Sequence, residues 1–172
     1  MPLVALVLMT LMFWVIYWFL RMGGIEHFRE RAALRKDEEC RAKARELERT
    51  ACLRAVDDPR DAATVLMLLI PRGGDPTPQQ TATIERTIIS VFGFSDELLD
   101  RMTNARFVAS SAESFEQAAK LFSQLLNTRL TDDERLDLIT MVEQVARLDG
   151  PLPSQIDAIA LLRQKLGLLI LA

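Results

Sequence analysis

The residues that could do chemistry in this chain are few, and their spacing supports no catalytic site. The only histidine is His27, and neither Cys40 nor Cys52 has a histidine within helical reach to act as a base for a thiolate. The stretch Arg72-Gly73-Gly74-Asp75 is rich in glycine, but it lacks the lysine and the following hydroxyl residue of a phosphate-binding loop. We therefore predict no catalytic, cofactor-binding or metal-binding residues and no enzymatic activity.

The first twenty residues, MPLVALVLMTLMFWVIYWFL, carry the strongest functional signal. From position 3 to position 20 they hold no charge, and this run spans about 27 Å as a helix, close to the thickness of a bilayer core. Trp14, Tyr17 and Trp18 lie towards its C-terminal end, where aromatic residues gather at a membrane interface, and Arg21 follows directly. We predict a single transmembrane helix over residues 1–20, with these four residues at the interface.

The orientation of this anchor follows from the charges beside it. A cleaved signal peptide would need a basic start and a small-residue cleavage site, and neither stands around the apolar run. No basic residue precedes the run and several follow it, so the positive-inside rule places the N-terminus outside and the rest in the cytoplasm. We predict a single-pass protein of the inner membrane. Cys40 and Cys52 are expected to be reduced.

Behind the anchor, charge divides the chain into a basic stalk and an acidic head. Residues 21–56 carry ten Lys or Arg against seven Asp or Glu, whereas residues 57–172 carry eleven against seventeen. The stalk is rich in strong helix formers, and we interpret it as a solvated helical spacer. Its small, loosely spaced apolar residues leave a coiled-coil homodimer open without supporting it. Nucleic-acid binding is not expected, because acidic residues interrupt the basic ones and the head is acidic.

Capping residues and prolines divide the head, residues 57–172, into helices. The segment DAATVLMLLI is apolar nearly all round, which predicts a central helix, and Phe115 begins a regular apolar stripe. In the second helix Ile84, Ile88, Val91 and Phe92 are expected to form one buried stripe. No segment alternates with a period of two, so the predicted class is all-α. The expected helix starts are Asp58-Pro59, Thr77-Pro78, Ser95-Asp96-Glu97, Phe115, Thr131-Asp132 and Pro153.

The first and last helix pairs of the head resemble each other. The breaks GGDPTPQQ and LDGPLPSQ align with an offset of 75, which matches Pro76 and Pro78 with Pro151 and Pro153. The triplets Phe-Gly-Phe at 92–94 and Leu-Gly-Leu at 166–168 follow with an offset of 74. Two such copies predict a pseudo-symmetric helical bundle.

The segment LTDDERLDLITMVEQVARLDGPLPSQIDAIALLRQKLGL resembles the second half of a TerB-like domain, the helical fold associated with tellurite resistance. Ala146, Asp149-Gly150, Leu152 and Leu166-Gly167-Leu168 carry the resemblance, and Asp58–Phe94 resembles the first half. A short external N-terminus, one span and a cytoplasmic TerB-like domain is also the layout of the DjlA-type membrane co-chaperones. The J domain of those proteins holds a His-Pro-Asp tripeptide, which this sequence lacks, so stimulation of a chaperone by that route is not expected.

The resemblance implies carboxylate clusters that bind metal in the two Asp-Gly loops, and here the sequence departs from it. The first loop has Gly73-Gly74 where Asp-Gly is expected, and Gln80 near the acidic position. The second loop keeps Asp149 but has Ile156 at the acidic position, with Asp157 one residue further. A hard divalent cation needs several convergent oxygens, so no metal site is predicted.

These observations favour a membrane-tethered, non-catalytic adaptor that recruits or senses a protein partner at the inner membrane face. The alternatives are an accessory subunit of a larger integral-membrane complex, whose span would be the interface, and an enzyme or metal-binding protein with an unrecognised site. The apolar end of the chain either caps the core or docks a partner. Its candidate docking residues are Leu168, Leu169, Ile170 and Leu171.

Overall fold

Every regular element in the described part of the chain is helical, which confirms the predicted all-α class. The structure is a computed structural model that describes residues 7–14, 17, 40–41, 43–71, 75–148, 150 and 152–168. The chain forms two compact units, Met1–Glu46 and Leu47–Ala172. The second unit therefore takes in the end of the predicted stalk, where Leu53 is fully buried in the core.

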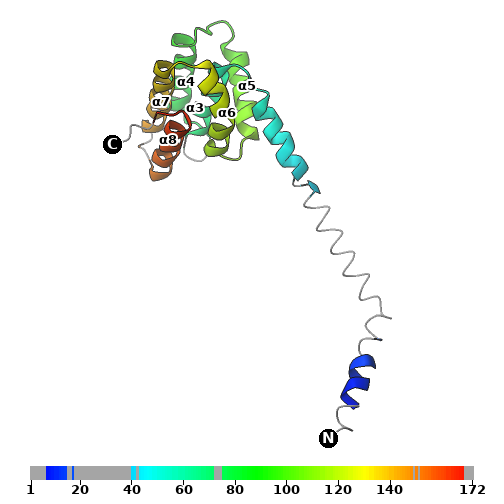
Figure 1. Cartoon of the computed structure of the whole chain (residues 1–172). Helices are drawn as coiled ribbons and strands as arrows, with labels where there is room; N and C mark the ends of the chain where they lie inside the picture. The colour runs from blue at the N-terminus through cyan, green and yellow to red at the C-terminus, as the bar shows by residue number, and fades with distance from the viewer. Residues whose placement is uncertain are drawn as a thin grey trace. The chain divides into compact units, whose positions relative to one another are not determined.

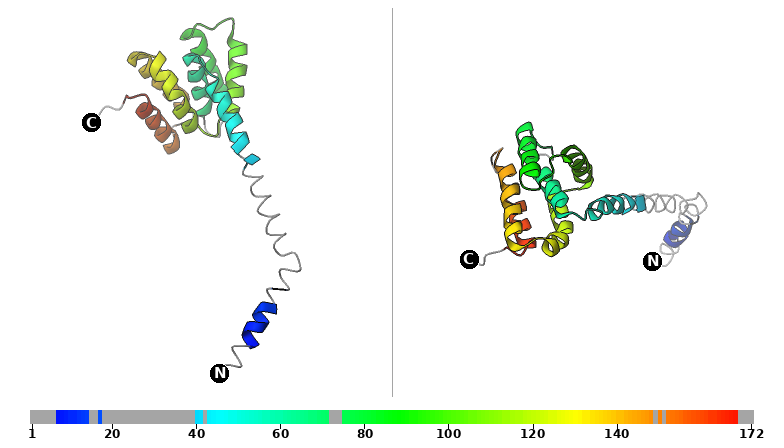
Figure 2. Two further views of the ribbon diagram at one scale, coloured as in Figure 1. Left: turned by 45° about the vertical axis from the view of Figure 1, so that its right-hand side comes forward. Right: turned by 90° about the horizontal axis from the view of Figure 1, so that it is seen from above.

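Six helices build the head, and they begin at or close to the predicted capping residues (Figures 1 and 2). Helical residues 43–54 precede them. Both figures show α7 and α8 lying side by side. The helices are α3 (Pro59–Leu69), α4 (Pro78–Ser90), α5 (Leu98–Ser111), α6 (Phe115–Arg129), α7 (Asp132–Arg147) and α8 (Pro153–Lys165).

Side-chain caps explain most of these starts. The carboxylate of Asp58 accepts a hydrogen bond from the backbone N–H of Arg60 at 2.9 Å, and the hydroxyl of Ser114 caps α6 in the same way. Thr77 and Thr131 form capping boxes with the residues three positions on. Such caps satisfy backbone donors that have no partner within the helix. The ends of α4 and α8 also match, since Gly93 and Gly167 take left-handed φ angles of 74° and 72°.

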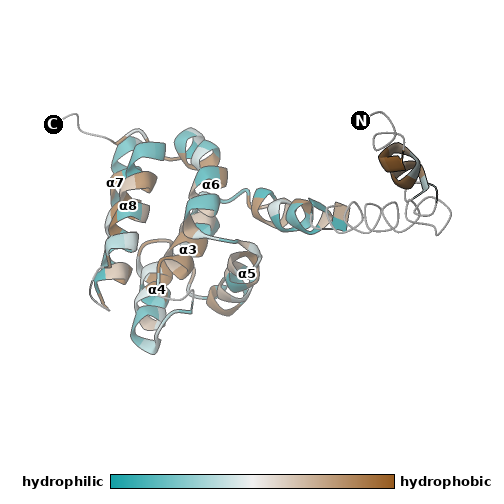
Figure 3. Ribbon diagram, turned by 90° about the horizontal axis from the view of Figure 1, so that it is seen from below, coloured by the Kyte–Doolittle hydropathy of each residue, from teal (hydrophilic) through white to brown (hydrophobic). Residues whose placement is uncertain are grey.

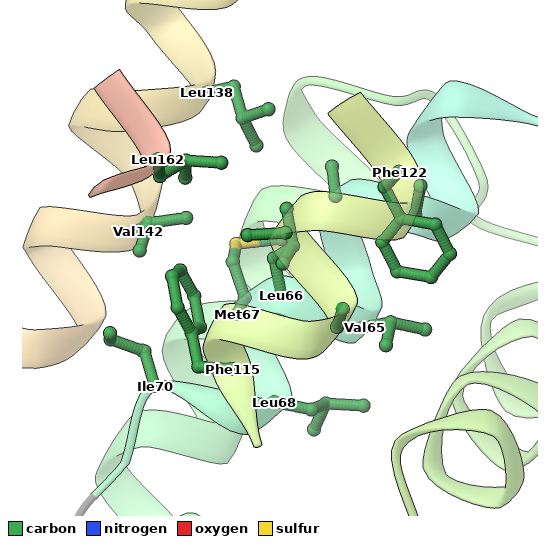
Figure 4. Close-up of a cluster of buried hydrophobic side chains, with 14 of the residues drawn as sticks. Val65, Leu66, Met67, Leu68, Ile70, Phe115, Phe122, Leu138, Val142 and Leu162 are labelled. Atoms are coloured by element: carbon green, nitrogen blue, oxygen red, sulfur yellow. The ribbon is translucent and has the colours of Figure 1, made fainter. Parts of the chain in front are cut away.

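Helix α3 lies at the centre of the head, as its apolar composition predicted. Every residue from position 62 to position 68 is buried, and α3 packs against α4, α5, α6 and α7 (Figure 3). Figure 4 shows Leu66 and Met67 among the side chains of Phe115 on α6 and Val142 on α7. The predicted stripe does not extend to Val91, which is the residue that caps the C-terminal end of α4 and is 59% exposed.

Two buried glutamines link the two similar helix pairs. The amide of Gln80, at the start of α4, donates to the carbonyl of Val145 near the end of α7, with an N···O distance of 3.2 Å. The amide of Gln155, at the start of α8, donates to the carbonyl of Ile70 at the end of α3, at 2.8 Å. Gln80 is fully buried and Gln155 is 5% exposed. Each glutamine therefore lies in the first turn of its own helix and donates to a carbonyl at the end of a helix in the other half.

The carboxamide oxygens complete this arrangement, which we call the glutamine brace. The Gln80 oxygen accepts from the backbone N–H of Thr77 at 2.9 Å, and the Gln155 oxygen accepts from that of Leu152 at 3.0 Å. The offset of 75 residues found in the sequence separates the two glutamines, their two backbone donors and their two carbonyl acceptors. The same contact is thus made twice, in opposite directions between the halves.

Replacing Gln155 with methionine tests the brace. The substitution keeps the length of the side chain but leaves the Ile70 carbonyl without its buried donor and the Leu152 N–H without its acceptor. We expect the free energy of unfolding to fall by about 1–3 kcal/mol, measured by urea denaturation followed by circular dichroism. The control is Gln164→Met in the same helix, where the side chain is exposed and little change is expected. Equal effects of the two substitutions would show that the brace does not stabilise the head.

Candidate functional site

The predicted membrane-interface residues fall partly within the described chain. Trp14 and Tyr17 are 65% and 52% exposed, whereas Trp18 and Arg21 lie outside the described residues. Residues 7–14 are helical, and their large apolar side chains all keep more than half of their surface exposed. The hydroxyl of Thr10, the one polar side chain there, donates to the carbonyl of Val7 at 2.9 Å.

The predicted transmembrane helix over residues 1–20 is described only at residues 7–14 and 17. Within the described parts of the chain, none of the helices combines the length and the apolar character that crossing a membrane requires. The predicted span therefore lies mostly outside the described residues and stays a prediction.

The predicted docking residues at the C-terminal end are described only at Leu168. Its side chain is half-buried and packs against the hydrophobic core, and its backbone N–H donates to the carbonyl of Arg163 at 3.0 Å. Leu169, Ile170 and Leu171 lie outside the described residues. The structure therefore assigns Leu168 a place in the packing of α8.

The other residues singled out in the sequence do not assemble into a site. Cys40 is exposed, Cys52 is half-buried, and both are free thiols. His27, the Arg72–Gly74 stretch and Asp149 lie outside the described residues. Within the part of the chain that the structure describes, no group of three or more His, Cys, Asp or Glu side chains is placed to hold a metal ion.

An ion-pair network joins the starts of α3 and α5, and its centre is Arg101. The guanidinium of Arg101 contacts the carboxylate of Asp61 at 2.7 Å and that of Asp58 at 3.4 Å, and its Nε donates to Glu97 at 3.0 Å. Arg60 makes a further pair with Asp58, with an N···O distance of 3.0 Å. Sequence reasoning identified Asp58 only as a helix cap. The pairing of Glu97 with Arg101 is visible in their spacing of four, but their contact with α3 is not.

The arginines of this network also pack against an aromatic ring. The guanidinium carbons of Arg60 and Arg101 lie 4.3 Å and 4.2 Å from the ring centroid of Phe94. Such contacts between a cation and an aromatic face are favourable, and they fix the loop after α4 against α3 and α5. The network therefore has a structural role.

Electrostatics within the network favour its charged state. The hydrogen bond to Asp61 raises the pKa of Arg101 above its usual value, although burial opposes this change. Burial raises the pKa of Asp58, but hydrogen bonds from Arg60 and the charges of Arg60 and Arg101 lower it by more. The net pKa of Asp58 lies below its ordinary value. Both groups are thus held charged by neighbours that position helices, so their shifted pKa values do not indicate catalysis.

A groove of about 710 Å³ lies between α5 and α6 on one side and α3 and the start of α4 on the other. Its apolar floor includes Leu68, Leu69 and Phe115, and its polar lining includes Asp75, Arg106 and Glu113. Glu113 is paired with Arg49 at 3.5 Å, and both side chains are more than half exposed. The mixed lining offers a binding surface but no set of groups arranged for acid–base or nucleophilic chemistry.

Comparisons with known proteins add no relative. No protein-family model matches this chain, and no curated protein or solved structure is detectably similar to it.

Replacing Asp58 with asparagine tests the ion-pair network through its pH dependence. Because the folded-state pKa of Asp58 is lowered, its charge stabilises the fold above the ordinary carboxyl value, about 3.9, and this stabilisation is lost as the pH falls through the folded-state pKa. We expect the wild type to exceed Asp58→Asn in stability at pH 6, and this difference to shrink below about pH 4. Urea midpoints measured across this range check it. The exposed Asp57→Asn control should show no such convergence, and a constant difference for Asp58→Asn would contradict the prediction.

Proposed function

We propose that this protein is a membrane-anchored, non-catalytic interaction module whose helical head recruits or senses a protein partner at the cytoplasmic face of the inner membrane. One observation carries the membrane part of the proposal: the helical residues 7–14 expose apolar side chains on every side. Covering the Val, Leu, Met and Phe side chains among them would be favourable by roughly 10 kcal/mol or more. Such a segment needs an apolar environment, and a bilayer supplies one.

The division of charge supports a head that faces the cytoplasm and not the lipid surface. The stalk, residues 21–56, has an excess of basic residues, which are attracted to anionic headgroups. The head carries an excess of six acidic residues, so an anionic leaflet repels it. The surface of the head therefore stays available to a protein partner.

The use of polar groups in the head supports a binding role. Among the described residues of the head, the groups with shifted pKa values are Asp58, Arg101 and Glu134, and all of them cap helices or join them. The buried glutamines serve the brace. Because these polar groups hold helices in place, they support a rigid scaffold that binds partners on its surface. The TerB-like resemblance of residues 57–168 also favours a scaffold of this kind. The accessory-subunit alternative requires the span itself to be the interface.

Two arginines placed in the apolar segment test the anchor. The variant Leu8→Arg/Leu11→Arg should lose membrane attachment, because each arginine near a bilayer centre costs about 2.5–3.5 kcal/mol. The measurement is the fraction of full-length chain that stays in the membrane pellet after alkaline extraction. The matched control is Leu47→Arg, which places the same charge at another exposed leucine and should remain in the pellet. Retention of the double variant would contradict the anchor.

Two altered chains, one with a replaced span and one without the head, distinguish the adaptor from the accessory subunit. Replacing residues 1–20 with a generic Leu/Ala span should preserve the partner captured from native membranes in mild detergent, whereas deleting residues 57–172 should release it. The partner would be identified by mass spectrometry with the unaltered chain as reference. The reverse pattern would show that the span is the interface.

A further inference from the structure

The two similar helix pairs form two halves of the head: α3 with α4 is the first half, and α7 with α8 is the second. The helices that pack over these halves differ. On the first half, α5 packs over α3 and α4 and contributes the buried side chains of Met102, Ala105 and Val108. Arg101 near the start of α5 pairs with the start of α3, and Ala109 near its end lines a groove with Leu68 near the end of α3. Helix α5 therefore runs parallel to α3.

The 75-residue offset identifies the matching surface on the second half. On the first half, Leu68 and Thr81 line a groove with Ala109 of α5, and the side chains of Leu68, Ile84 and Ile88 are buried. Their counterparts are Glu143 on α7 and Ile159 and Arg163 on α8.

These counterparts line a groove of about 290 Å³ between α7 and α8. Figure 3 shows α5 beyond α3 on one side of the head, with α7 and α8 at the opposite side. We call this surface the α7–α8 groove. Its floor includes Ala146, Ile156 and Ile159, and its rim includes Glu143, Arg147 and Arg163.

The floor of the α7–α8 groove exposes apolar surface at an unexpected place. Ile156 is 55% exposed, although it lies in the first turns of a helix whose other outward residues are mostly polar. Its counterpart in the first half is Thr81, a polar residue. Ile156 thus adds exposed apolar surface to the groove floor beside Ile159 and Ala146.

The rim is basic, in contrast to the head as a whole. Arg147 contacts Glu143 at 2.9 Å, and Arg163 pairs with the other oxygen of the same carboxylate. The two arginine side chains are 70% and 49% exposed, whereas Glu143 is 20% exposed. Two positive charges thus share one negative charge and leave a local excess that attracts carboxylates.

We propose that the α7–α8 groove docks an amphipathic α-helix of a partner protein, with aliphatic residues on one face and Asp or Glu beside them. A helix fits because α5 fills the corresponding place on the first half. The aliphatic face matches Ile156 and Ile159, and the acidic flank matches Arg147 and Arg163. The proposal rests on the proposed adaptor function, for which it names the docking surface and the class of partner.

Site-specific photo-cross-linking tests this surface in the full chain. The photoreactive residue p-benzoylphenylalanine replaces Ile156, and the chain is held in nanodiscs of neutral phosphatidylcholine. The probes are two 18-residue helical peptides with the same leucine stripe, one flanked by glutamate and one by lysine. We expect the glutamate peptide to give about tenfold more adduct, because like charges meet when the lysine peptide docks. The same photoreactive residue at Phe107, exposed on α5, is the control and should give little adduct with either peptide.

Charge variants complete the test. Arg147→Glu/Arg163→Glu should reverse the preference towards the lysine peptide, with folding checked by circular dichroism. Glu143→Gln, which removes the shared carboxylate without adding charge, should strengthen the preference for the glutamate peptide. Equal adducts with both peptides, equal labelling at position 107, or adducts with a second copy or with residues 169–172 would overturn the proposal. None of these outcomes depends on alkaline extraction, so failure here is distinguishable from failure of the anchor.

Discussion

The head depends on the glutamine brace. Because Gln80 and Gln155 are buried, their amides must find partners inside the protein, and each finds them in both halves at once. One carboxamide fixes the first turn of its own helix through its oxygen and the last turn of a distant helix through its nitrogen. The starts of α4 and α8 are therefore held to the ends of α7 and α3. Helix α3 packs on four neighbours, α4, α5, α6 and α7.

Other polar interactions attach α5 and the loop after α4 to the helices that the brace joins. The Arg101 network ties α5 to the start of α3, and Phe94 brings the loop after α4 into the same cluster. Helix α5 packs on α3 and α4, while α7 and α8 carry a groove with a basic rim. The two halves therefore differ at this face, and the difference distinguishes the α7–α8 groove from the rest of the surface of the head.

Local features were predictable from sequence and long-range ones were not. Caps such as Asp58 and Thr131 depend on residues two or three positions away, so the helix starts could be located to within a few residues. The 75-residue offset was visible, and it already aligned Gln80 with Gln155. Their contacts with Val145 and Ile70 were not foreseeable, because hydrogen bonds between distant segments depend on how the helices pack. Ile156 is a second example: the sequence marked it only as the residue at an expected acidic position, and its place in the groove depends on the packing of α7 and α8.

The two bonds of the brace span 65 and 85 residues of chain. Contacts of such separation require most of the head to be present before either can close. During synthesis, the carbonyl of Ile70 has no amide to meet until Gln155 has been added, long after the caps of α3 and α4 can form. The brace is therefore completed late: a chain that ends after α7 can form the bond from Gln80 to Val145, but the bond from Gln155 to Ile70 has to wait for the first turn of α8.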